Sequence, residues 1–112
     1  MKKVIAALLT ALTVLLVLTA CGGAKAADYP TAAKAEAALN AGKKLEGKTV
    51  TFKVLKVEPR SAFGYNLEAG KHLNFASAKN PGVKKGATVT VKVKKVASML
   101  GSYIISYTDL KQ

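Results

Sequence analysis

Few residues in this chain could carry covalent or acid–base chemistry. It has a single cysteine, Cys21, and a single histidine, His72. A structural zinc site takes about four Cys or His ligands, and a disulfide or a CxxC redox motif takes two cysteines, so the chain can form none of these by itself. We expect the lone imidazole of His72 to face solvent or a ligand rather than to act as a general base.

The acidic and hydroxyl side chains add no catalytic pattern. No two carboxylates share a motif that would bring them together as an acid–base pair. The serines lie outside any G-x-S-x-G context, and no glycine motif for phosphate is present. We therefore expect no enzyme activity, no cofactor and no metal. The six carboxylates are Asp28, Glu36, Glu46, Glu58, Glu68 and Asp109.

The position of Cys21 gives it a different chemistry. Met1-Lys2-Lys3 is a short basic segment, and residues 4–20 are 17 residues without a charge. This layout is typical of a secretory signal. An uncleaved transmembrane anchor is the alternative, although a spanning helix takes roughly 20 apolar residues.

The end of the apolar run, Leu18-Thr19-Ala20-Cys21, resembles the lipobox of bacterial lipoprotein precursors. The resemblance implies cleavage before Cys21 and a thioether-linked diacylglyceryl group, with fatty acids such as palmitate, on its sulfur. Two acyl chains hold a protein stably on a bilayer, whereas one does so only marginally. The expected location is the extracytoplasmic face of the cell membrane, with the lipid on Cys21 as the membrane contact.

Three segments follow from this reading. Residues 1–20 are the signal peptide, residues 21–30 a flexible tether rich in glycine and alanine, and residues 31–112 one folded domain. The whole chain carries a net charge of +12. Loss of Lys2 and Lys3 leaves 16 basic and 6 acidic residues, a net charge of +10. The remaining length is enough for one modest core.

The folded part predicts one helix followed by strands. A helix is expected at 31–41, with Thr31 as its N-cap and a weak apolar stripe, or else this segment extends the tether. Residues 48–54 alternate as a strand with Val50, Phe52 and Val54 on one face, followed by a bulge at 55–56 and an end at Pro59. Further strands are expected at 62–67, 72–75, 86–96 and 101–108, with a loop at 76–85.

The chain also repeats itself. GKTVTFKVLKV at 47–57 matches GATVTVKVKKV at 86–96 at 8 of 11 positions, and each copy is followed by Ser, two apolar or small residues and Gly. Two similar hairpins are the simplest explanation.

Five short strands in this order resemble an OB-fold, a small five-stranded barrel in which a three-strand meander and a hairpin meet. The helix leading into LEGKTV at 45–50 resembles small bacterial lipoproteins with a tRNA-anti-like OB domain. Here, however, the helix precedes the first strand, whereas an OB helix usually lies between the third and fourth strands. An SH3-like barrel or an open sandwich are the alternatives.

The lysines are the remaining functional signal. They either keep the strands soluble, or attract anionic lipid headgroups, wall polymers or glycans. A partner protein could also dock on the sheet, but we do not expect nucleic acid as the ligand of an exported protein. The candidate ligand-binding residues are Lys53, Lys92, Lys94, Tyr65, His72 and Phe75, where the rings would supply stacking surfaces.

Overall fold

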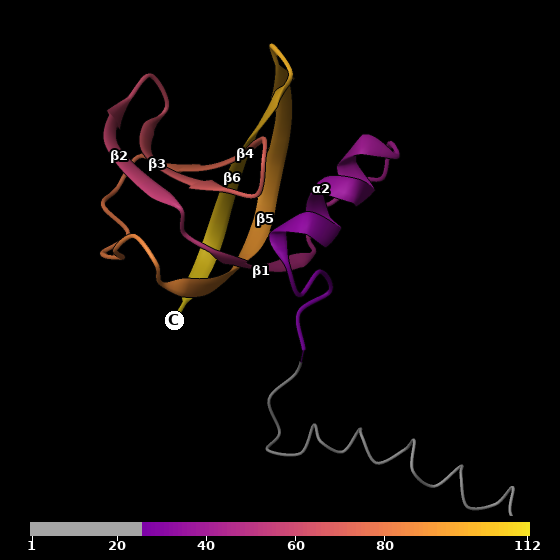
Figure 1. Ribbon diagram of the computed structural model, residues 1–112, viewed down its shortest axis with the longest axis horizontal. Helices are drawn as coiled ribbons and strands as arrows, with labels where there is room; N and C mark the ends of the chain where they lie inside the picture. Colours follow the sequence, from indigo (N-terminus) through magenta and orange to yellow (C-terminus); the bar gives the residue numbers. More distant parts are fainter. Residues whose placement is uncertain (1–25) are drawn as a thin grey trace, which may run out of the picture.

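The computed structural model describes residues 26–112; the predicted signal peptide, Cys21 and the first part of the predicted tether lie outside the described residues. The described chain is mainly β, with one short helix and six strands (Figure 1). The strands form one sheet in the order β1-β5-β6-β4-β3-β2, which is not closed because β1 and β2 are its edges. The elements are α2 (Ala32–Asn40), β1 (Thr49–Lys53), β2 (Lys56–Ser61), β3 (Gly64–Ala69), β4 (Leu73–Ser77), β5 (Thr88–Met99) and β6 (Ser102–Lys111).

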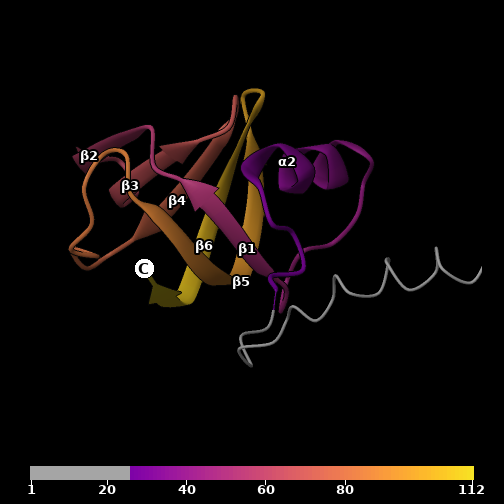
Figure 2. The same cartoon turned by 60° about the horizontal axis from the view of Figure 1, so that its bottom comes forward.

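The predicted helix is confirmed. The Thr31 side chain accepts a hydrogen bond from the backbone N–H of Lys34 at 3.1 Å, which satisfies one of the free donors at the helix start. Ala35, Ala38 and Leu39 are buried, and the helix lies beside β1 (Figure 2). Because α2 is docked by this face, the alternative of a longer tether through this segment is wrong.

The bulge predicted at residues 55–56 is instead the point where one strand ends and another begins, so the first predicted strand is two strands, β1 and β2. Val54 donates its backbone N–H to Ala87 O, and the next residue, Leu55, donates to Glu68 O, both at 2.8 Å. The chain therefore leaves one edge of the sheet and enters the other. The prediction that Pro59 ends the strand is wrong, because Pro59 lies inside β2. An edge strand tolerates proline, since the missing N–H need not pair with a neighbour.

The other strands match the predicted ones with shifted ends. β2, β3 and β4 form an antiparallel meander, and β5 and β6 form a long hairpin. A parallel pairing of β4 with β6 joins these two units. The hairpin is longer than predicted, since β5 continues to Met99, and its tip lies at the opposite end of the domain from Ala26 (Figure 1).

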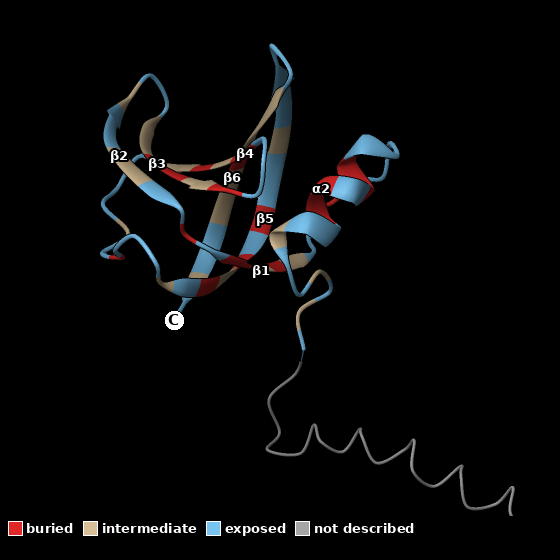
Figure 3. Cartoon of the chain, viewed as in Figure 1, coloured by how far each residue is buried: buried red, intermediate tan, exposed pale blue. Residues whose placement is uncertain are grey.

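The core lies inside the curved sheet, as Figure 3 shows by burial. Val50, Phe52 and Val54 are at most 2% exposed, which confirms the predicted inward face. The Phe52 ring stacks on Phe75 with centroids 3.9 Å apart. Leu45, Leu67 and Ile105 are also fully buried. The meander, the β5–β6 hairpin and the segment between α2 and β1 therefore share one core.

The two copies of the sequence repeat pair with each other. β1 and β5 are antiparallel, with Thr51 opposite its own equivalent, Thr90, and their hydroxyl oxygens are 2.6 Å apart. The flanking hydrogen bonds correspond as well: Gly47 N donates to Val93 O at 2.8 Å, and its equivalent, Gly86 N, donates to Val54 O at 2.7 Å. The repeat therefore forms a local pseudo-two-fold ribbon, in addition to starting the two predicted hairpins.

The end of the predicted tether is part of the fold. Tyr29 N donates to Thr49 O at 2.9 Å, and Thr51 N donates to Tyr29 O at 2.8 Å, so Tyr29 adds a short parallel bridge to the edge of β1. The Asp28 carboxylate accepts a hydrogen bond from Thr49 N at 3.0 Å. The folded part thus begins at Asp28, before the predicted boundary at residue 31.

Candidate functional site

Phe75, predicted to stack on a ligand, belongs to the core. Its ring is 0% exposed and lies nearly parallel to Phe52, at an interplanar angle of 8°. A ring without accessible surface cannot stack on a ligand, so we remove Phe75 from the candidate residues. Alternation along β4 explains its burial, because Phe75 shares the inward face with Leu73.

The three candidate lysines are exposed but do not form one cluster. In the β1–β5 ladder, Lys53 pairs with Thr88 and Lys92 with Thr49, so these two lysines lie at opposite ends of the ladder. Lys94 lies at an irregularity of β5, between the pairs Val93–Tyr107 and Lys95–Ser106. It lines a different surface from Lys92.

That surface, which we call the basic groove, is a hollow of about 690 Å³ on the outside of the sheet. The turn between β2 and β3, the end of β4, β5 and β6 all contribute to it. Lys79 and Lys94 are its cations, Phe63 is a ring 40% exposed, and the lining contains no carboxylate. The lining residues are Phe63, Ala76, Ser77, Ala78, Lys79, Lys94, Ile104, Ser106, Tyr107 and Thr108.

A tight turn brings Phe63 to this groove. Ser61 Oγ accepts a hydrogen bond from Phe63 N at 3.0 Å and donates one to Gly64 O at 2.6 Å. Gly64 has φ +96°, and a Cβ at this position would lie 2.6 Å from Ser77 O. Only glycine allows the turn to approach the end of β4 so closely. Phe63 was not among the candidate ligand-binding residues, and the structure places it in the groove.

The two tyrosines near the groove differ in environment. Tyr65 is half-buried on β3, in register with Ser77, and does not line the groove. Tyr107 does line it. Burial raises the pKa of the Tyr107 hydroxyl above its ordinary value. The hydroxyl oxygen of Tyr107 is itself buried, so it is not accessible to a ligand in the groove.

His72 lies apart from the groove, in the turn before β4, where it meets a buried carboxylate. Its Nδ1 atom is 2.5 Å from Oε2 of Glu36 on α2. Oε1 of Glu36 accepts hydrogen bonds from the backbone N–H of Lys71 at 2.9 Å and of His72 at 3.1 Å. Burial alone would raise the pKa of Glu36, but the hydrogen bonds from the His72 ring and the two amides outweigh it, so the pKa lies below its ordinary value.

The Glu36–His72 pair joins the helix to the turn before β4. A carboxylate and an imidazole need a hydroxyl or thiol in reach of the ring to make a nucleophile. In residues 26–112 no serine, threonine or tyrosine hydroxyl is hydrogen-bonded to His72, and no group of three His, Cys, Asp or Glu could hold a metal ion. The sequence contained a signal for the pair, because Glu36 falls on the same helical stripe as Ala32 and Leu39.

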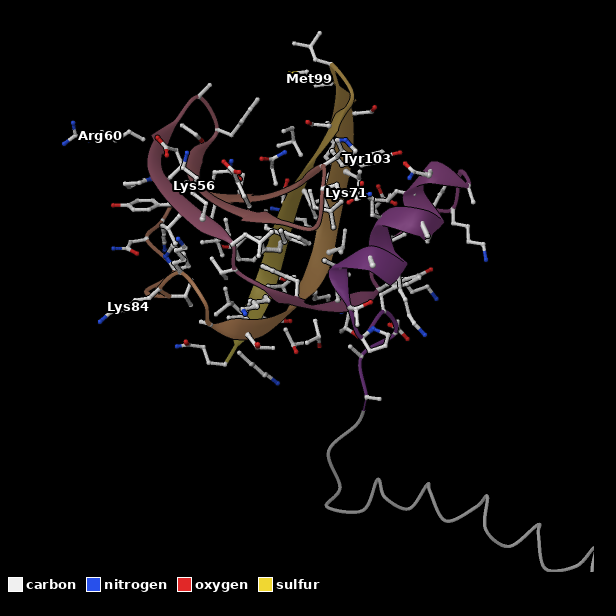
Figure 4. All side chains as sticks on the ribbon, viewed as in Figure 1. Lys56, Arg60, Lys71, Lys84, Met99 and Tyr103 are labelled. Carbon is white, nitrogen blue, oxygen red and sulfur yellow. The ribbon has the colours of Figure 1, made fainter. Side chains whose placement is uncertain are left out.

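Comparison of the chain with protein-family models, curated proteins and solved structures finds no match. Among residues 26–112, no helix is long and apolar enough to cross a membrane. Among the surfaces described above, the basic groove combines two lysines, several hydroxyl groups and an exposed aromatic ring. Elsewhere, Arg60 and Lys84 extend away from the sheet into solvent (Figure 4).

Proposed function

We propose that the chain is an exported lipoprotein, anchored through lipid on Cys21, whose folded domain is a non-catalytic binding module for an anionic ligand of the cell envelope. The anchor is supported by the residues Leu18-Thr19-Ala20-Cys21 at the end of an uncharged run. The folded part begins at Asp28, so a short segment joins the anchor to the domain.

We propose further that the sheet is of the OB type. The support is its connectivity: a meander and a hairpin are joined by a parallel pair, β4 with β6, and by an antiparallel pair, β1 with β5. β1 and β2 then correspond to one bent strand, divided at Val54–Leu55. OB domains commonly bind ligands on the face of their second and third strands, which are β3 and β4 here. The basic groove lies at the end of this face.

The composition of the groove is the observation that supports an anionic ligand. Lys79 and Lys94 supply positive charge, and Ser77, Ser106 and Thr108 carry hydroxyls. Because no carboxylate lines the groove, these lysines have no acidic neighbour there to neutralise them. Phosphate or carboxylate groups on a wall polymer, a lipid headgroup or an acidic glycan suit such a surface, and the exposed ring of Phe63 suits the face of a sugar.

A salt-dependent binding measurement tests this proposal. We expect the domain to bind poly(glycerol phosphate) or hyaluronate, and K79Q/K94Q to weaken binding about 10-fold, since each exposed ion pair contributes up to about 1 kcal/mol. The matched control is K43Q/K44Q, which removes the same charge from an exposed loop after α2. Equal weakening by both variants would leave only a general effect of net charge and would refute a groove site.

A specific observation favours a second function, that of an interaction module docking a partner protein, with the lysines serving solubility. The outer half of the β5–β6 hairpin, residues 96–108, has no charged residue. Met99 lies at its tip (Figure 4). Met99 is 45% exposed, and Leu100 is 99% exposed. An uncharged tip with large apolar side chains is suited to contact with an apolar surface of another protein.

The anchor has its own test. Cys21→Ser should release the chain from the membrane fraction or leave an unprocessed precursor. A Cys21→Ser chain that fractionates and migrates like the wild type would show that lipid on Cys21 is not the anchor.

A further inference from the structure

A second basic surface lies on the outside of the β1–β5 ribbon. Val50, Phe52, Val89 and Val91 point into the core, so the residues that alternate with them face outward. Lys111 of β6 joins this side because it pairs with Thr90. We call this surface the threonine–lysine face, made of Thr49, Thr51, Lys53, Thr88, Thr90, Lys92 and Lys111.

The pseudo-two-fold ribbon gives this face a regular charge pattern. Lys53 and Lys92 are equivalent positions of the two repeats and lie on either side of the Thr51–Thr90 pair. From strand geometry their Cα atoms are about 14 Å apart. Lys92 and Lys111 line a hollow that also contains Thr49, Thr88 and Thr90. The face is therefore broad, cationic and rich in hydroxyl groups.

The same hollow is also where the segment 21–28, which leads from Cys21, reaches the domain. Its lining includes Ala26, Ala27 and Asp28. Asp28 contributes a carboxylate to it, and Oδ2 of Asp28 accepts hydrogen bonds from the backbone N–H and the hydroxyl of Thr49, at 3.0 and 3.2 Å. These bonds and the Tyr29 bridge fix the point from which the chain runs back to Cys21.

The length of that segment limits where the domain can be. Seven residue steps separate Cys21 from Asp28, and a fully extended chain covers at most about 3.6 Å per step, or about 25 Å in all. A lipid on Cys21 would thus hold Asp28 within about 25 Å of the bilayer surface. The threonine–lysine face borders Asp28, so the same anchor would hold this face close to the bilayer.

We propose that the threonine–lysine face docks on the anionic lipid headgroups of the membrane that holds the anchor. This inference rests on the proposed anchoring through Cys21. Each lysine near an anionic membrane surface strengthens binding about fivefold. Docking by this face directs the hairpin tip with Leu100 away from the membrane, because the tip lies at the opposite end of the domain in both views (Figures 1 and 2).

The test couples the chain from Cys21 onward, through the Cys21 thiol, to maleimide lipid in vesicles. Two vesicle types are compared: phosphatidylcholine alone, and an equimolar mixture with phosphatidylglycerol. Acetylation of each lysine is followed by mass spectrometry. We expect slower acetylation of Lys53, Lys92 and Lys111 on the anionic vesicles, with Lys56 and Lys71 unchanged. Equal rates on both vesicle types, or protection of Lys79 and Lys94 in their place, would overturn the proposal.

A vesicle sedimentation experiment identifies the ligand of the threonine–lysine face. For the uncoupled chain, K92Q/K111Q should weaken binding to the anionic vesicles about 30-fold, and K43Q/K44Q much less. If poly(glycerol phosphate) in solution protects the face and anionic vesicles do not, its ligand is a wall polymer and the lipid proposal is wrong. Chemical coupling makes the result independent of natural lipidation, and K79Q/K94Q reports separately on the basic groove.

Discussion

Replacing Glu36 by glutamine removes the charge that ties α2 to the turn before β4. The carboxylate accepts two backbone N–H bonds and faces the His72 ring, and its side chain is 9% exposed. Hydrogen bonds to a charged acceptor contribute about 1.5–3 kcal/mol, against about 1 kcal/mol for neutral ones. Glutamine keeps the amide bonds in their weaker form. The His72 side chain is 53% exposed, so solvent screens that part of the interaction. We expect E36Q to lose about 1.5 kcal/mol of unfolding free energy near neutral pH.

The pH dependence gives the sharper measurement. The folded-state pKa of Glu36 lies below its ordinary value of 4.5. Its contribution is therefore fully present above that value and is lost as the pH falls through the lower, folded-state pKa. At acidic pH, protonated Glu36 resembles glutamine, so the difference between the wild type and E36Q should shrink toward zero.

The assay is urea unfolding followed by far-ultraviolet circular dichroism, repeated from neutral to acidic pH. The matched control is E46Q, which makes the same change at an exposed residue. Near neutral pH, E36Q should also lower Tm by about 10 °C, since 1 kcal/mol shifts a domain of this size by about 4–8 °C. A deficit that stays constant down to acidic pH, or an E36Q no less stable than E46Q, would refute this reasoning.

Three other outcomes can be measured by the same unfolding assay. Leu100 has φ +50°, a strained backbone conformation for leucine, and its side chain is not buried. L100N should therefore stabilise the domain by about 1 kcal/mol, with L55N at another exposed leucine as the control. A destabilised L100N would contradict the presence of backbone strain at this position. Burial raises the pKa of Tyr107 above the ordinary tyrosine value of 10.0, so the free energy of unfolding should fall as the pH rises above 10.0. Y107F should show less of this fall. Identical alkaline profiles for Y107F and the wild type would contradict this expectation. F75A should cost about 3–5 kcal/mol, because it empties the centre of the core, and a cost below about 1 kcal/mol would contradict that placement.

Local patterns predicted the elements well because their causes are local. The Thr31 cap and the alternation of Val50, Phe52 and Val54 depend only on residues close by in the sequence. The irregularity after Val54 was predicted as a bulge, because the passage of the chain to the other edge of the sheet depends on distant partners. Pro59 misled the prediction because its effect depends on whether the strand has a partner on its N–H side. That is decided by the position of β2 at the edge of the sheet.

The candidate site depended on contacts between distant residues, which patterns do not give. Phe75 was assigned to a ligand because it is aromatic, yet its partner, Phe52, comes from another strand. Glu36 and His72 are 36 residues apart and meet only because the helix docks beside the turn. The grouping of Phe63, Lys79 and Lys94 likewise requires the turn, the loop after β4 and β5 to be placed together. Lys94 alone was foreseen.

The ribbon formed by β1 and β5 has a consequence for neighbouring copies of the chain. A strand that recognises a near-copy of itself can satisfy the same bonds with the corresponding strand of another molecule. The single chain keeps its own pairing because tethered segments meet at an effective concentration in the millimolar range. A high local concentration of copies narrows that advantage, and strand exchange between neighbours is the assembly error that this pairing allows.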